Sequence, residues 1–450
     1  MSAPARPRSK LSRLLVLLRF ALAVLFCYWP AVEVLRISLS PSFRATGRPP
    51  QLRRWLEATA GRFESWAVDF RTAQKAAAAH THDVAATEWP MFGSVFFLLA
   101  VQDAETLHPG LFDSSPKIRR AVEAAAAIVA DPVTATWVRR QWGEDYLTRE
   151  NAFYRSLLLH GLTAHARITG DTRHHALLRA QVRSLKNELL AAPSHLVDDY
   201  PGQCWPVDVT WAVAGIQRAA ALLDEPADDL PKIFMETVNA RLMDDSGTPA
   251  SMANARTGRP TAPARGVSNS GLLLFAADLD APIAAEWYAA YARGFWQDNA
   301  WFSGFREMVK GGPDGFQDVD SGPVIQGVGA AASAFGIGAA LRAGRVDHAA
   351  PMTLQGVAVS CPTPFGFIVP GLMGKVAMDG WPMAESALLF AWTRPSPPGA
   401  ATPWTGRTPP LVRAAVGVYL LAGFLLWPGL PALARIFRRR RASPYGRGQG

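Results

Sequence analysis

Two long apolar segments lie near the ends of the chain, and they limit what the residues between them can fold into. The first, residues 14–36, is interrupted by Arg19, Pro30 and Glu33, and the second covers residues 411–434. At about 1.5 Å per residue, a helix of either length crosses the hydrocarbon layer of a bilayer. We therefore expect two transmembrane helices, with the lipid bilayer as a partner.

Basic residues are concentrated in the two terminal tails, residues 1–13 and 435–450. Short flanks rich in Lys and Arg stay on the cytoplasmic side, so both termini are predicted to be cytoplasmic. Residues 45–400 are then predicted to lie outside the cytoplasm, as the periplasmic domain of a protein in the bacterial inner (cell) membrane. The bulky residues 27–33 offer no small-x-small cleavage site, so we expect an uncleaved anchor rather than a signal peptide. The tails also explain much of the net charge of +9, so we expect no nucleic-acid partner.

The central segment, residues 45–400, has the apolar spacing of amphipathic helices and is rich in Ala and Leu. Short turns separate the helices, as at residues 169–171, where Gly ends one helix and Asp begins the next. After Pro351 the pattern is less regular, and we expect loops and short strands there. The expected helices are residues 53–79, 91–104, 118–130, 150–168, 174–191, 207–223, 230–243, 284–296 and 324–343. This pattern predicts an all-α domain of helical hairpins, which in a ring would form a toroid around a central funnel.

One loop combines a thiol, carboxylates and aromatic rings. Cys204 is a candidate nucleophile or acid, and the alternative is a small buried thiol. A helix can begin at Pro206, and the alternative role of an acid at position 208 is to favour the positive end of that helix. A carboxylate among aromatic rings has a raised pKa and can act as a general acid. The loop and the start of this helix therefore supply two candidate catalytic acids and three candidate substrate-binding aromatics: Asp199, Asp208, Tyr200, Trp205 and Trp211.

A second acidic loop lies about a hundred residues further along the chain. Glu307, Asp318 and Asp320 are candidate catalytic acids, and Arg306 is a candidate substrate-binding residue. The alternatives are an ion pair between Arg306 and Glu307 and a simple turn at 318–323 before the next helix. Every second helix in a ring of hairpins runs in the same direction. Both acidic loops are therefore predicted to lie at the same end of the ring. Their mutual repulsion should then raise at least one pKa.

Residues 150–154, with His160 and the turn at 168–170, resemble the helix motif of the linalool dehydratase/isomerase family. Gln203-Cys204 is similar to that family's catalytic cysteine loop, and residues 306–307 and 318–322 are similar to its later motifs. The resemblance runs from about residue 66 to 393. It implies an (α/α)6 barrel that removes or adds water at a terpenoid alcohol without a metal or nucleotide cofactor.

The chain also departs from that family. The family's catalytic histidine falls on Leu157, and His160, one helical turn later, is the candidate catalytic histidine of this chain. A lone histidine on an apolar helix is more often a satisfied core residue than a catalyst. The second cysteine of the family has no counterpart between Cys27 and Cys204. Three further candidate substrate-binding residues lie within or just before the motif helix: Trp142, Asn151 and Tyr154.

These residues leave three functions open. The first is a hydro-lyase or isomerase that acts on an alcohol through acid–base chemistry. The second is a glycoside hydrolase that acts on envelope or extracellular glycans through paired carboxylates, and the third is a non-catalytic envelope module. No CxxC, HExxH or phosphate-binding loop occurs, so we expect neither metal nor cofactor. A disulfide between Cys204 and Cys361 is possible in an oxidising compartment.

Overall fold

The computed structural model describes residues 10–80, 83–226, 228–370, 383–397, 399 and 402–427. These residues are mostly helical, with a few short strands, which confirms the prediction of an all-α domain. The longer helices of the body are α4 (Leu52–Thr72), α7 (Trp89–Leu107), α9 (Pro116–Val129), α11 (Ala152–Thr169), α12 (His175–Ala191), α13 (Pro206–Leu222), α14 (Leu230–Arg241), α15 (Gly266–Leu279), α16 (Ala281–Phe295), α17 (Ala330–Arg342), α18 (Val346–Ser360) and α20 (Met383–Thr393).

Shorter helices and four two-stranded antiparallel sheets fill the connections. The helices are α3 (Pro41–Thr46), α5 (Lys75–Ala78), α6 (Val84–Thr87), α8 (Leu111–Ser114) and α10 (Thr136–Trp142). The strands are β1 (Met252–Asn254), β2 (Arg259–Ala262), β3 (Trp296–Asp298), β4 (Ser303–Phe305), β5 (Val324–Ile325), β6 (Val328–Gly329), β7 (Pro362–Thr363) and β8 (Gly366–Phe367), paired in sequence order.

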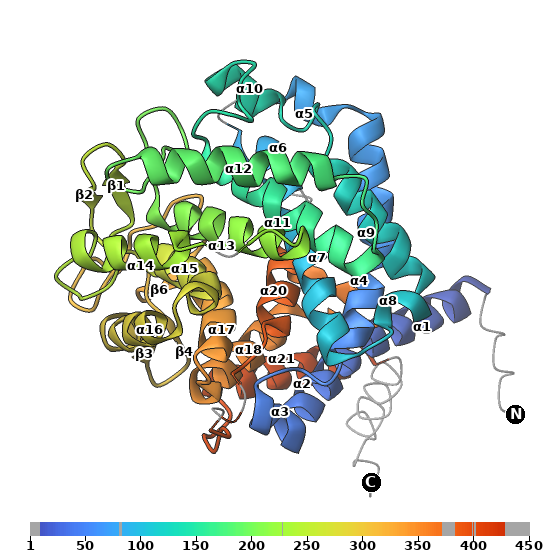
Figure 1. Ribbon diagram of the computed structural model, residues 1–450. Coiled ribbons are helices and arrows are strands. Elements are labelled where there is room, and N and C mark those ends of the chain that lie inside the picture. Colours follow the sequence, from blue (N-terminus) through green and yellow to red (C-terminus); the bar gives the residue numbers. More distant parts are fainter. Residues whose placement is uncertain are drawn as a thin grey trace, which may run out of the picture.

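Six helices contact one another in a closed order: α7, α11, α13, α15, α17, α20 and again α7. Figure 1 shows these six around the middle of the body. The helices α9, α12, α14, α16 and α18 each connect one member of the ring to the next, and α4 precedes α7 and contacts α9 and α20. Because chain direction reverses at each connection, the six ring helices run the same way, and their N-termini share one end of the ring.

The ring helices are apolar on nearly all sides because they are covered from within and from without. Small residues let them approach closely. A Cβ atom added at Gly161 of α11 would lie 3.0 Å from a Val129 methyl, and one at Gly215 of α13 would lie 3.0 Å from Leu159 Cβ. Substitution of either glycine would therefore push neighbouring helices apart.

Two expectations about the second half of the chain are wrong. The helix expected at residues 324–343 begins only at Ala330, because residues 324–329 form the hairpin of β5 and β6. The region after Pro351, expected to be loops and short strands, does contain the short strands β7 and β8, but the absence of helices implied by that expectation is wrong where the region is described. Helix α18 continues through Pro351 to Ser360, and α20 follows the small sheet of β7 and β8. Burial of almost every residue of α18 outweighs the one backbone hydrogen bond that the proline removes.

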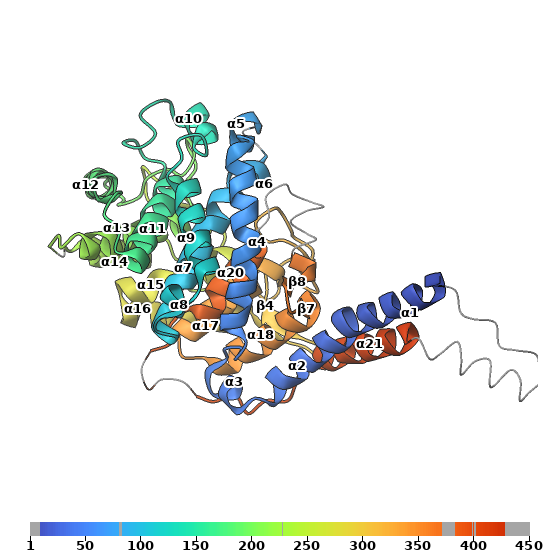
Figure 2. The ribbon, with the colours of Figure 1, turned by 90° about the vertical axis from the view of Figure 1, so that its right-hand side faces the viewer.

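A helical hairpin projects from this body (Figure 2). Its first arm is α1 (Lys10–Ala23), a π-helical turn at Val24–Tyr28 and α2 (Trp29–Leu39), and its second arm is α21 (Pro410–Leu426). Among the described residues, one helix, Leu14–Leu39, is long and apolar enough to cross a membrane. Helix α21 is apolar but shorter, and residues 428–434 of the second expected span lie outside the described residues.

The first arm belongs only in part to the projecting hairpin. Glu33, which interrupts the apolar segment, is 1% exposed and forms an ion pair with Arg54 of α4 at 2.5 Å. Pro30, Val34 and Ile37 are also buried. The last turns of the expected span 14–36 therefore also pack on the body.

Candidate functional site

A Trp-Pro pair begins two of the ring helices and brings acids to the same end of the ring. Glu88 precedes Trp89-Pro90 of α7, and Asp208 lies in the first turn of α13, which begins at Pro206. The residue before Pro206 is extended, as expected, and proline in a first turn removes no helical hydrogen bond. Both acids are therefore fixed by the helix starts themselves.

The loop before α13 is held by a short network. Asp199 Oδ2 accepts a hydrogen bond from Trp205 N at 2.5 Å, and Gln203 N donates to Tyr200 O at 2.8 Å. Ala253 N of β1 donates to the carbonyl of Cys204 at 2.9 Å. This loop is thus tied both to the helix that follows it and to the neighbouring sheet.

Asp208 lies close enough to other acids to interact with their charges. Burial raises its pKa well above the ordinary range, and the charges of Asp320 and Glu88 raise it further. Among the described residues, no hydrogen bond or ion pair reaches the Asp208 carboxylate, which retains partial access to solvent. Burial, and then the charge of Asp208, also raise the pKa of Asp199. The loop near residue 204 and the loop near residue 320, far apart in sequence, thus contribute acids to one cluster.

Glu88 completes the cluster. Its Oε1 accepts a hydrogen bond from the hydroxyl of Tyr200. Burial raises the pKa of Glu88 to about 7, with a further contribution from Asp320, against the lowering effect of the Tyr200 hydrogen bond. Partial desolvation and the charge of Asp318 raise the pKa of Asp320, although its side chain is exposed at the surface of the loop. Glu88, with a pKa of about 7, can give or take a proton near neutral pH.

Arg265, at the start of α15, holds the other two acids of the second loop. Its Nε donates to Glu307 Oε1 at 2.7 Å, and its Nη2 donates to Asp318 Oδ1 at 2.9 Å. The same Asp318 oxygen accepts from the backbone N–H groups of Asp320 and Ser321. Asp318 therefore fixes the loop and positions Asp320. Burial raises the pKa of Glu307 to about 7 despite Arg265, whereas the hydrogen bonds to Asp318 leave its pKa lowered against the effect of burial.

The ion pair considered between Arg306 and Glu307 is not formed. Arg306 binds Asp314 at 2.5 Å and Gln297 at 2.6 Å, while Glu307 binds Arg265. Neighbouring residues in this extended segment point to opposite sides. Arg306 thus holds the surface loop at 308–314 and does not join the acidic cluster.

Cys204 is fully buried, and its thiol is free. Burial, and then the charges of Asp199 and the neighbouring acids, raise its pKa well above the ordinary range. These surroundings oppose formation of the thiolate that a nucleophile needs. Cys361 is also free and lies beside Phe26 of the helical hairpin, so the possible disulfide with Cys204 is not formed.

His160 lies in the core, away from the acidic cluster. Its Nε2 is 2.9 Å from the carbonyl oxygen of Trp211, and its ring packs on Phe275. Burial, and then the charge of Arg218, lower its pKa well below the ordinary range, so the imidazole is neutral. Leu157, the position matching the catalytic histidine in the resemblance, is fully buried.

The aromatic candidates divide into two groups. Tyr200 and Trp205 lie at the acidic cluster with their rings edge to face at 5.7 Å. The others have structural contacts elsewhere. Trp211 donates from Nε1 to Gly271 O within the ring, and Tyr154 packs on Trp137 and Tyr146. Trp142 ends α10 beneath Arg149. Asn151 precedes the first residue of α11 without a side-chain capping hydrogen bond, and its amide donates to Tyr146 O.

The sequence did not single out Glu88 or give Arg265 a role. Glu88 looks like an ordinary acid before a helix, and Arg265 was one of several polar residues before an apolar helix. The available signal was the repeated Trp-Pro pair, which marks two helix starts with an acid beside each, Glu88 before one pair and Asp208 after the other. Among the described residues, no group of three His, Cys, Asp or Glu side chains is placed to hold a metal ion.

The opposite end of the ring carries arginines. Arg394 follows α20, is 1% exposed, and binds Asp103 of α7 at 2.9 Å and Asp278 of α15 at 3.2 Å. Arg342 of α17 binds Asp278 as well. Arg218 of α13 donates to Gln102 at 2.9 Å, and burial lowers its pKa to about 10. Acids at one end and arginines at the other give the ring a definite polarity.

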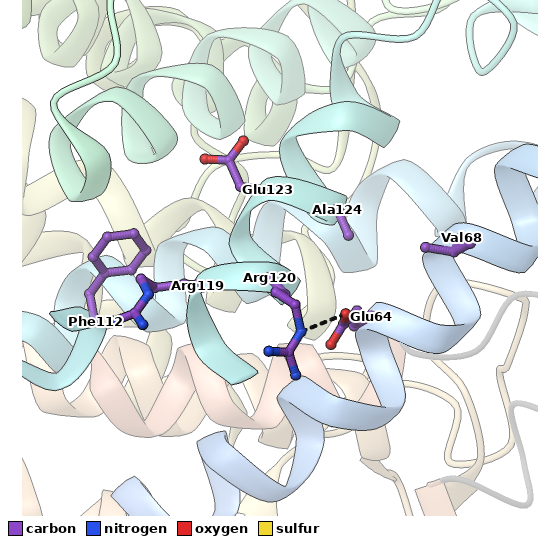
Figure 3. A pocket seen from close by; sticks show the side chains of 7 residues that line it. All are labelled: Glu64, Val68, Phe112, Arg119, Arg120, Glu123 and Ala124. Atoms are coloured by element: carbon purple, nitrogen blue, oxygen red, sulfur yellow. Dashed lines mark hydrogen bonds and ion pairs between the residues drawn. The ribbon is translucent and has the colours of Figure 1, made fainter. Parts of the chain in front are cut away.

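A depression of about 330 Å³ lies on the outer surface between α4 and α9 (Figure 3). Its acids are already paired, Glu64 with Arg120 at 2.8 Å and Glu123 with Arg173 and His165. Charged residues with exposed partners are typical of a solvated helix surface. We therefore place the candidate site at the acidic cluster and not in this depression.

Comparison with models of known protein families finds no match to this chain, and comparison with curated protein sequences finds none either.

Proposed function

We propose that the ring is an (α/α)6 barrel, anchored in a membrane by the helical hairpin, and that the acidic cluster at its N-terminal end is an acid–base active site for a reaction at a C–O bond. The observation that supports this proposal most directly is the environment of the Asp208 carboxylate. This carboxylate interacts with the charges of Asp320 and Glu88, its pKa is raised, and no described residue neutralises it. An unpaired carboxyl with a raised pKa near other acids is costly for stability and typical of a catalytic site.

In this proposal Asp208 is the general acid and Asp320 the general base. Asp208, whose pKa is raised well above the ordinary range, donates a proton to the departing oxygen of the substrate. Asp320, on a loop that solvent reaches, accepts a proton from the carbon next to the breaking bond, or from an attacking water. The first case is elimination of water from an alcohol, and the second is hydrolysis of a glycoside.

The resemblance to the linalool dehydratase/isomerase family supports the first case, a hydro-lyase or isomerase. Two observations favour glycoside hydrolysis as the second candidate. The thiol and the imidazole that would distinguish the lyase, Cys204 and His160, are both buried and unsuited to proton exchange at the N-terminal end of the ring. Tyr200 and Trp205 lie beside the acids, and aromatic rings suit the apolar face of a sugar.

The test uses the purified full-length protein with two substrate panels, terpenoid alcohols and envelope oligosaccharides. Asp208→Asn and Asp320→Asn keep the side-chain size but lose acid–base capacity, so each should lower the turnover rate by about a hundredfold or more. Asp171→Asn, in the turn between α11 and α12, is the control, because its partner is Arg173. Full activity in both site variants would refute the proposed acid–base pair. Binding without turnover of either panel by the unaltered protein would support a non-catalytic envelope module.

We also propose that both chain ends are cytoplasmic and that the body lies outside the cytoplasm. The described ends of α1 and α21 lie at the same far end of the hairpin (Figure 2), and Arg19 donates to the carbonyl of Leu425 between the two arms. Reporter fusions after Gly47 and after Gly450 should then report opposite compartments. The same compartment for both fusions would refute this topology.

A further inference from the structure

Two exposed aromatic residues stand at the tips of turns beside the helical hairpin. Trp301, in the turn between β3 and β4, is 57% exposed, and Phe365, between β7 and β8, is 68% exposed. Val359 and Val369, close to the second turn in sequence, are 49% and 39% exposed. Single exposed apolar residues are normal on a protein surface, but large aromatics at turn tips are costly in water.

Direct contacts tie these turns to the hairpin. The carbonyl of Trp301 accepts a hydrogen bond from Leu411 N, in the first turn of α21, at 3.0 Å. Just before β7, the thiol of Cys361 lies 4.0 Å from the carbonyl oxygen of Phe26. The hydroxyl of Tyr419 donates to Ala358 O at 2.7 Å. Both aromatic turns therefore belong to the part of the body from which the hairpin projects, where Figure 2 shows β7 and β8.

Two arginines lie on the part of the hairpin that is next to the body. Arg36 of α2 is 64% exposed at the side chain, and Arg413 in the first turn of α21 is exposed as well. Arginine together with tryptophan is the usual composition at the boundary between water and hydrocarbon. An arginine there reaches lipid phosphates while its stem stays in an apolar layer.

We infer that this face of the body, with Trp301, Val359, Phe365 and Val369, rests in the headgroup layer of the bilayer. The inference depends on the membrane anchoring proposed above, because the hairpin is what brings lipid to this face. The inference adds that the body itself contacts the bilayer, in addition to being anchored by the hairpin. Helix α4 of the body runs across the direction of the hairpin (Figure 2).

The experiment measures the accessibility of nitroxide labels in the full-length protein, held in nanodiscs of phosphatidylethanolamine and phosphatidylglycerol. The labels are attached to Trp301→Cys and Phe365→Cys in a background in which Cys27 and Cys361 are replaced by alanine. The two probes of accessibility are molecular oxygen, which concentrates in lipid, and a nickel chelate, which stays in water. The ratio of oxygen to nickel accessibility should be several-fold higher at positions 301 and 365 than at Leu190→Cys, on the outer helix α12, which is 41% exposed.

A label at Leu17→Cys, which is 64% exposed on α1, separates the two proposals. A lipid signal at position 17 with a water signal at 301 and 365 would overturn the seating of the body and leave the anchoring intact. A water signal at position 17 would overturn both. A lipid signal at 17 with intermediate signals at 301 and 365 would support the inference.

Discussion

Replacement of Glu88 by glutamine should make the protein more stable at alkaline pH. Glu88 has a pKa of about 7 in the folded chain, against an ordinary value of 4.5, chiefly because it is buried. A carboxyl with a raised pKa binds more protons in the folded than in the unfolded chain. Its contribution to stability is therefore greatest below pH 4.5, declines as the pH rises to about 7, and stays lost above that.

The difference between these two pKa values corresponds to about 3 kcal/mol, which is an upper limit because Glu88 shares the cluster with other acids. Glutamine keeps an oxygen to accept the hydrogen bond of Tyr200 and cannot ionise. Glu88→Gln should therefore be more stable than the unaltered protein at pH 8 by up to about 3 kcal/mol, and nearly equal to it at pH 4.5.

The measurement is the midpoint of thermal unfolding, followed by circular dichroism in detergent at both pH values. At pH 8 the midpoint of Glu88→Gln should be higher by several degrees. Glu57→Gln is the matched control, because Glu57 pairs with Arg53 on the exposed side of α4. If Glu88→Gln were no more stable than the unaltered protein at pH 8, the Glu88 carboxyl would not have the raised pKa that its burial and the nearby Asp320 give it.

Three further changes test other parts of the structure. Cys204→Ala should keep activity within about twofold and cost about 1 kcal/mol of stability, and the native thiol should react with a thiol reagent only after unfolding. His160→Leu should leave the shape of the pH–activity profile unchanged, because the imidazole is neutral, and should lower the unfolding free energy by about 1 kcal/mol through the lost hydrogen bond to Trp211. Arg394→Met should lower the unfolding midpoint strongly, since it leaves Asp103 buried without its partner at a cost of about 3–5 kcal/mol, whereas Arg173→Met at the surface should not.

Local sequence predicted the helices well wherever apolar spacing and caps agreed. At residues 169–171 the expected helix end is confirmed, because Gly170 adopts the left-handed conformation that ends α11. The expected start at Asp171 is wrong: Asp171 accepts a hydrogen bond from Arg173 N, and α12 begins at His175. The other errors lie where tertiary contacts decide. Residues 324–329 carry an apolar pattern that extends the helix, yet they pair as β5 and β6. Pro351 suggests a loop, yet it is buried within α18.

The candidate acids on their two loops were visible in the sequence, but their roles were not. Nothing in the sequence distinguishes Asp318 from Asp320 as a candidate acid. The position of Arg265 decides, because it pairs with Asp318, whereas the charge of Asp320 acts on Asp208. Glu88 joins the cluster from a helix start more than a hundred residues earlier. No local pattern carries that information, because it depends on which helices share an end of the ring.

The shared direction of the six ring helices has an electrical consequence. Each helix places about half a positive charge at its N-terminus and about half a negative charge at its C-terminus. Six aligned helices thus create an electric field along the ring axis. The arginines balance the partial negative charges at the C-terminal end, and the acids balance the partial positive charges at the N-terminal end. Without its carboxylates the N-terminal end would attract anions. We therefore expect the double variant Asp208→Asn, Asp320→Asn to bind sulfate where the unaltered protein does not.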